Sequence, residues 1–132
     1  MNQQLNKIAL LVNDYDEAIA FYVNILKFEL IEDTVLSPSK RWVVVKPKGA
    51  GQCGLLLAKA ATTVQKNAIG NQTGGRVFLF LYTDDLDRDH QNLLQHHVQI
   101  IREPSNEGFG RVLVFADLYG NLWDLIQPDE GT

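Results

Sequence analysis

Asp124 is a carboxylate in the middle of an apolar run, with Leu122, Trp123, Leu125 and Ile126 around it. An ionised carboxylate is costly to bury unless a positive partner meets it. Three partners fit this chemistry: a metal ion, a basic side chain or water. What Asp124 faces therefore indicates which chemistry the chain can perform.

The other residues with metal-binding or nucleophilic chemistry are three histidines and one cysteine. His90, His96 and His97 lie in or just after one predicted helix. His90 and His97 share a face of that helix, but two turns separate them by ~10 Å, too far to chelate one ion. Cys53 is the only cysteine, so the chain forms no internal disulfide and no cysteine-based metal site.

The composition is that of an ordinary globular domain, with 132 residues, 45% hydrophobic residues and a net charge of -4. This acidic balance does not favour nucleic-acid binding, and the basic cluster between residues 40 and 48 is typical of a solvated strand edge. Residues 1–14 lack the apolar run of a signal peptide or a membrane span. We therefore expect a cytoplasmic protein that binds neither nucleic acid nor a membrane.

The hydrophobic pattern predicts one order of elements twice. In the first half we expect a strand, a helix and three strands at residues 7–12, 16–27, 28–33, 41–46 and 55–60. In the second half the same order is expected at residues 76–83, 86–97, 98–103, 111–117 and 121–127, with Pro104 ending the third of these elements. Residues 105–110 are expected to form a loop.

The two halves align with an offset of roughly 70 residues, which fits one βαβββ unit repeated. Asn13 and Asp14 superpose on Asp84 and Asp85 as turn and helix-cap residues. We predict an α+β fold with a first module at 1–60, a linker with one short helical turn at 61–75, and a second module at 76–132. A lone unit of this size has a thin core. We therefore expect curled mixed sheets to share a cavity, where function resides.

Two segments carry a resemblance to a known family. NDYDEAIAFYVNILKFEL, residues 13–30, is similar to the opening signature of the vicinal oxygen chelate superfamily, and FADLYGNLWDLIQP, residues 115–128, resembles its closing signature. This superfamily includes glyoxalase I, extradiol dioxygenases and bleomycin and fosfomycin resistance proteins. The resemblance covers nearly the whole chain, and it implies the same duplicated fold, commonly as a homodimer.

The resemblance also implies four metal-ligand positions, which fall on Lys7, Leu56, Phe78 and Asp124. Leucine and phenylalanine have no donor atom, and a protonated lysine offers hydrogens rather than a lone pair. Because side chains alternate along a strand, a slip of two residues keeps the same face. No His, Asp or Glu then replaces the first three. We hypothesise that the Lys7 ammonium replaces the missing cation and neutralises Asp124.

These residues favour a metal-independent protein of the glyoxalase/bleomycin-resistance type, which sequesters a small organic ligand in an apolar cavity and needs no cofactor. We expect Lys7 and Asp124 to be polar anchors. Arg111 or Arg102 would act as a charge clamp beside the loop at 105–110, which forms either a plain hairpin or a lid tipped by Phe109. The expected walls of the cavity are Trp42, Leu56, Phe78, Phe80 and Tyr82.

Two other functions stay open. One is a glyoxalase-like lyase or isomerase, or a dioxygenase-like enzyme, with a divalent metal bound by other residues than those named. The other is a structural or regulatory dimer without a ligand.

Overall fold

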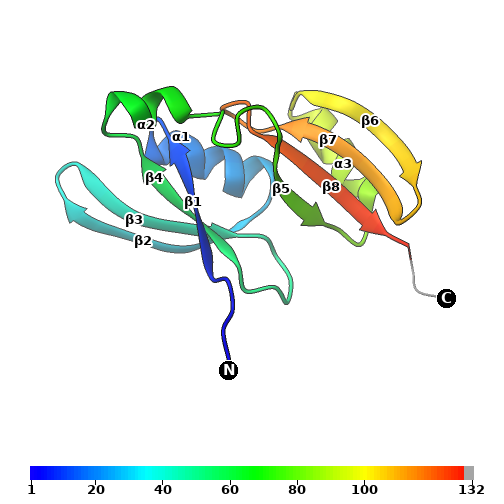
Figure 1. The fold of residues 1–132 in the computed structure, drawn as a ribbon, viewed down its shortest axis with the longest axis horizontal. Helices are drawn as coiled ribbons and strands as arrows, with labels where there is room; N and C mark the ends of the chain where they lie inside the picture. Colours follow the sequence, from blue (N-terminus) through cyan, green and yellow to red (C-terminus); the bar gives the residue numbers. More distant parts are fainter. Residues whose placement is uncertain (130–132) are drawn as a thin grey trace. The chain divides into compact units, whose positions relative to one another are not determined.

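The computed structural model describes residues 1–129, and the chain divides into two units, the first at 1–69 and the second beginning at Gly70 (Figure 1). The first unit contains β1 (Lys7–Val12), α1 (Tyr15–Ile19), its π-helical continuation η1 (Ala20–Ile25), β2 (Glu29–Ser37), β3 (Lys40–Lys46), β4 (Gly54–Lys59) and α2 (Thr63–Ala68). The second contains β5 (Val77–Tyr82), α3 (Leu86–Gln95), β6 (Ile100–Glu107), β7 (Gly110–Ala116) and β8 (Leu122–Pro128). Among the residues described, no helix is long and apolar enough to cross a membrane.

Each unit builds one four-stranded mixed sheet, in the orders β1-β4-β3-β2 and β5-β8-β7-β6. The first strand of each unit pairs in parallel with the last, and the other neighbours are antiparallel. The two sheets therefore have the same topology, and neither is closed. This arrangement confirms the predicted α+β fold of two βαβββ modules.

Both long helices begin at the predicted aspartates. The side chain of Asp14 accepts a hydrogen bond from the Glu17 backbone at 2.8 Å, and Asp85 accepts one from Arg88 at 3.0 Å. Each satisfies an N–H group that the first helical turn leaves without a partner. The cap residues stand one repeat apart, as the alignment of the halves predicts.

The helix ends also repeat. Lys27 and His97 each adopt a left-handed backbone, with φ of 66° and 57°. A left-handed residue after the last turn is a common way to end a helix, although it usually is glycine. His97 thus has a structural place in the chain.

Both faces of each sheet contain buried residues, and the face toward the helix carries one part of the core. In the first unit Leu10, Val12, Val43, Val45 and Leu57 are buried on the side of the helix. Leu113, Phe115, Trp123 and Leu125 do the same in the second, with Leu86 and Leu93 of α3. We call the opposite side of each sheet its helix-free face, formed by the residues that alternate with these. The predicted site residues are to be sought there.

Two sequence predictions in the second unit are wrong. The strand predicted to end at Pro104 continues as β6 to Glu107, because the ladder to β7 is irregular between Arg102 and Ser105, and an irregular ladder tolerates a residue without an N–H group. The expected loop at 105–110 shrinks to a turn at Gly108 and Phe109 between β6 and β7. The connection is therefore a plain hairpin, and the alternative of a lid tipped by Phe109 is wrong.

Candidate functional site

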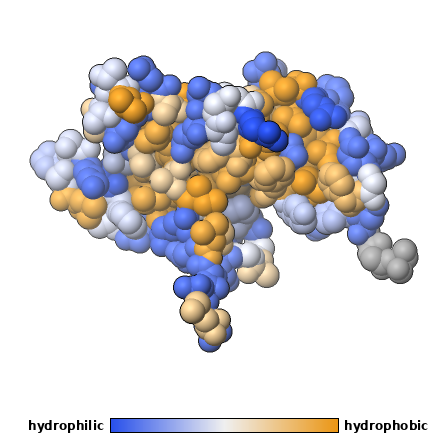
Figure 2. Space-filling model, viewed as in Figure 1, coloured by the Kyte–Doolittle hydropathy of each residue, from blue (hydrophilic) through white to orange (hydrophobic). Residues whose placement is uncertain are grey.

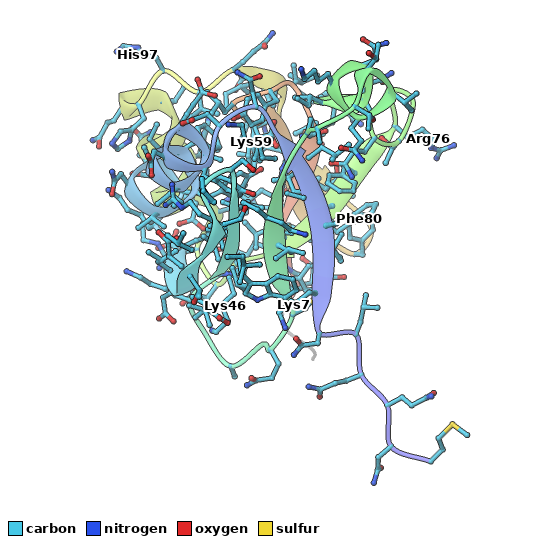
Figure 3. All side chains as sticks on the ribbon, turned by 90° about the vertical axis from the view of Figure 1, so that its left-hand side faces the viewer. Lys7, Lys46, Lys59, Arg76, Phe80 and His97 are labelled. Carbon is cyan, nitrogen blue, oxygen red and sulfur yellow. The ribbon has the colours of Figure 1, made fainter. Side chains whose placement is uncertain are left out.

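The helix-free face of the second sheet exposes aromatic side chains along its edge strand β5. Phe80 and Tyr82 stand two residues apart on this strand and are 63% and 67% exposed, and Figure 3 labels Phe80. Phe78 is half-buried at an irregularity of the ladder between Val77 and Leu79. Figure 2 shows hydrophobic residues, in orange, on the surface that faces the viewer. Exposed aromatic rings at neighbouring alternate positions give a flat apolar ligand a surface to stack on.

Asp124 lies beside these rings. In the ladder it stands opposite Phe80 of β5 and Val114 of β7, half-buried on the same face. Burial raises the pKa of the Asp124 carboxyl, and the positive charge of Arg102 opposes part of that rise. Within its own unit, Asp124 therefore faces an aromatic ring and a guanidinium. Its predicted pairing with Lys7, which belongs to the other unit, stays a prediction.

The helix-free face of the first sheet carries two of the predicted apolar residues, Leu56 and Trp42. Leu56 of β4 is half-buried between Ala9 of β1 and Val44 of β3, its partners in the ladders. Trp42 of β3 is half-buried and stands opposite Thr34 of β2. These residues form an apolar floor that runs along the strands.

Lys7 lies at one end of this floor and lines a pocket of about 220 Å³. Its ammonium donates a hydrogen bond to Asn6 Oδ1 at 2.5 Å. Lys46, Gln52 and Gly54 also line the pocket. The basic cluster of residues 40–48 predicts a solvated strand edge for Lys46. The signal that this prediction misses is that Lys46 alternates with Val44 and so shares the face of Lys7.

Arg111 lies on the opposite side of its sheet. It stands opposite Gln127 in the ladder, and its guanidinium is 3.0 Å from Asp87 at the start of α3. This hydrogen bond lowers the pKa of the Asp87 carboxyl. The first unit has the same contact between Arg41 and Asp16, at 2.9 Å. The guanidinium is thus engaged in a helix-to-sheet contact, and we leave Arg111 out of the proposed ligand site.

The donors on the helix-free faces do not fit the metal site that the resemblance implies. On β1, β4 and β5 the residues of that face are Lys7, Ala9, Leu11, Gly54, Leu56, Ala58, Phe80 and Tyr82, with Val77 and Phe78 at the irregular start of β5. None of these side chains is a His or a carboxylate, and β8 supplies Asp124 alone. Within residues 1–129, no three His, Cys, Asp or Glu side chains gather into a group that could hold an ion. A catalytic ion needs about three protein ligands.

The three histidines have structural contacts or backbone roles within the second unit. The ring of His90 is 3.6 Å from the Glu103 carboxylate, and His96 Nδ1 is 2.9 Å from the backbone oxygen of Asn92. Together with the backbone role of His97, these contacts account for the cluster that the sequence shows. Cys53 is half-buried in the loop before β4.

Comparison with known proteins agrees with this architecture. An uncharacterized protein of Shewanella frigidimarina (strain NCIMB 400) is 56% identical over 131 residues, which cover 98% of this chain and 97% of that one. TnmS3, an antibiotic binding protein from Streptomyces sp. CB03234, is 31% identical in a solved structure with a TM-score of 0.78, covering 97% and 98%. A member of the Glyoxalase/bleomycin resistance protein/dioxygenase superfamily from Sphaerobacter thermophilus DSM 20745 is 27% identical in a solved structure with a TM-score of 0.73. The match covers 96% of this chain and 98% of that one.

The profile of the Glyoxalase/Bleomycin resistance protein/Dioxygenase superfamily matches residues 4–125. The chain therefore belongs to this superfamily, as the two signature segments predict.

Proposed function

We propose that this protein binds and sequesters a small organic ligand on the helix-free faces of its sheets, without a metal ion. The observation that carries the proposal is the exposure of Phe80 and Tyr82, at 63% and 67%, on a strand whose alternate residues Leu79 and Leu81 are half-buried. Large apolar groups held at a surface commonly mark a binding site. TnmS3, which has the same fold, is an antibiotic binding protein.

In this proposal, aromatic and aliphatic side chains form the ligand-contacting surface of each sheet, and one charged group on each sheet orients the ligand. Phe78, Phe80 and Tyr82 line the second sheet, and Trp42 and Leu56 line the first. Lys7 and Asp124 are the polar anchors. A mainly apolar site with a few placed polar groups suits a flat, partly charged molecule.

The proposal includes a cytoplasmic homodimer. Oligomers of small proteins usually close around a two-fold axis, and a ligand site completed by a second chain would cover rings that one chain leaves exposed. Sedimentation of the purified protein measures the dimer, and a monomer at all concentrations would remove this part of the proposal.

The experiment is a thermal-shift screen against planar aromatic antibiotics, glutathione adducts and metal salts. A true ligand at ~100 times its dissociation constant adds about 2.7 kcal/mol to the free energy of unfolding. We expect planar aromatic compounds to stabilise the protein and metal salts alone to leave it unchanged. Metal analysis of protein purified without chelator completes the test. About one tightly held Ni, Zn, Fe or Mn ion per chain would instead favour an enzyme, since catalytic ions are retained by several ligands.

A further inference from the structure

We propose that Lys7 and Lys46, on either side of Gly54, form a subsite for an acidic group of the ligand. The ligand class is then an organic anion with a flat apolar body. This inference rests on the proposed function and narrows it.

The subsite is built by three neighbouring strands of the first sheet. Lys7 of β1 pairs with Gly54 of β4 in the ladder. On the other side, a Cβ placed at Gly54 would lie 3.6 Å from Lys46 Cβ and 3.1 Å from Val44 Cγ1. Neighbouring strands are ~4.8 Å apart, so the two lysine stems stand about 10 Å apart across the glycine. Glycine adds no side chain between them, and the pocket of about 220 Å³ lies there.

Of the two ammonium groups at this pocket, only that of Lys46 has a carboxylate of residues 1–69 within ion-pair distance. Lys46, whose side chain is 18% exposed, is 3.7 Å from Glu29. Among residues 1–69, no carboxylate pairs with Lys7, whose ammonium donates to the Asn6 amide oxygen. Glu32 also borders the pocket and keeps its negative charge, since a hydrogen bond from the Thr34 hydroxyl at 3.2 Å does not neutralise a carboxylate. The two lysines that border the pocket outnumber this one carboxylate. A carboxylate, phenolate or sulfonate would accept hydrogen bonds from the lysine ammonium groups.

The apolar floor begins directly beside the lysines. One step along the strands from Gly54, the helix-free face carries Ala9, Leu56 and Val44, and the following step carries Trp42. Figure 3 shows Lys7 and Lys46 at one end of this sheet and Lys59 at the other. An acidic group bound by the lysines would thus place an attached apolar ring system over the floor. An inorganic anion would contact the lysines but not the apolar floor.

Two fluorescent dyes with one aromatic skeleton test the inference. Anilinonaphthalene sulfonate carries a negative charge, and N-phenyl-naphthylamine has the same rings without it. We expect the wild-type protein to bind both, the sulfonate more tightly. Lys7→Gln and Lys46→Gln should each weaken sulfonate binding about fivefold and leave the neutral dye within about twofold. Lys59→Gln, in the same sheet but outside the pocket, is the matched control and should change neither affinity. Melting temperatures show that each variant is folded.

The outcomes separate the two proposals. If both dyes bind equally and the lysine variants change nothing, the subsite is overturned and the proposed function stands. An equal loss of sulfonate binding in Lys59→Gln would also overturn it, because the dye would then respond to general surface charge. If neither dye nor any aromatic compound in the thermal-shift screen binds to the wild type, the proposed function itself fails, and the subsite with it.

Discussion

Replacing Phe80 by alanine separates a ligand-binding aromatic from a core aromatic. Phe80 is 63% exposed on the helix-free face, whereas Phe115 on the opposite side of its sheet is 1% exposed. A residue that serves a ligand should lose binding and little stability when it is truncated. A core residue should do the reverse.

The magnitudes follow from the exposed area. A phenylalanine side chain presents about 200 Å², of which 63% is free at Phe80. A flat ligand that covers one side of the ring removes about 65 Å² from water, which is worth about 1.6 kcal/mol, or roughly a fifteenfold change in the dissociation constant. The buried third of the ring contributes at most about 2 kcal/mol to folding. Truncation of the buried Phe115 should cost about 3–5 kcal/mol.

The assay combines dye titration with thermal unfolding of the wild type, Phe80→Ala and Phe115→Ala. For Phe80→Ala we expect roughly fifteenfold weaker binding of N-phenyl-naphthylamine and a melting temperature lowered by less than about 8 °C. Phe115→Ala should show the larger loss of stability. Unchanged dye affinity in Phe80→Ala, or a stability loss as large as that of Phe115→Ala, would refute the assignment of this face to a ligand. Sedimentation of the same samples shows whether the ring instead stabilises a dimer.

Three further predictions concern charges and turns. Asp117→Ala should lower the free energy of unfolding by about 2–4 kcal/mol, because the buried carboxylate accepts three hydrogen bonds of 2.9 Å from Tyr119 and Asn121. Asp117→Asn keeps a hydrogen-bond acceptor and should lose less stability. Equal losses in the two variants would contradict the role of Asp117 as an acceptor in this turn. The raised pKa of Asp124 means that the wild type loses stability as the pH rises above the unfolded value of ~3.9. Asp124→Asn should therefore melt higher than the wild type at pH 7, with the difference vanishing near pH 4; a pH-independent difference would count against burial as the cause. If Lys7 and Asp124 pair in the free protein, Asp124→Asn and Lys7→Met should couple by roughly 0.5–3 kcal/mol in a double-mutant cycle, and strict additivity would remove the pair.

The fold could be predicted from the sequence because its signals are local and occur twice. Asp14 and Asp85 are strong helix-cap residues, and their spacing reveals the repeat without any knowledge of tertiary contacts. The extent of β6 could not be predicted in the same way. Pro104 is a strand breaker in most ladders, and only the irregular pairing with β7 makes room for it.

The site could be predicted in part, for the same physical reason. Alternation places Phe80 and Tyr82 on one face from the sequence alone, and the structure shows that face to be free of helix. The contact that Arg111 makes could not be predicted, because a basic residue at the end of a hairpin gives no signal of its partner. Its partner Asp87 lies 24 residues away along the chain, so only folding brings them together.

One helix-to-sheet contact is the same in the two modules. The contact between Arg41 and Asp16 recurs between Arg111 and Asp87, with distances of 2.9 and 3.0 Å. Both pairs join the start of a helix to the third strand of its sheet, on the side that packs the core. The duplicated core side of each module has kept this contact.

The helix-free faces have instead diverged at equivalent positions. Lys46, the last residue of β3, corresponds to Ala116 at the end of β7. The third residue of β4 is Leu56, whereas the third residue of β8 is Asp124. If these faces served only to fill a symmetric core, apolar residues would suit both modules, because a buried charge is costly in either. The charges on the helix-free faces therefore differ between the modules while the helix-to-sheet contact repeats, which is expected if those faces orient an asymmetric ligand.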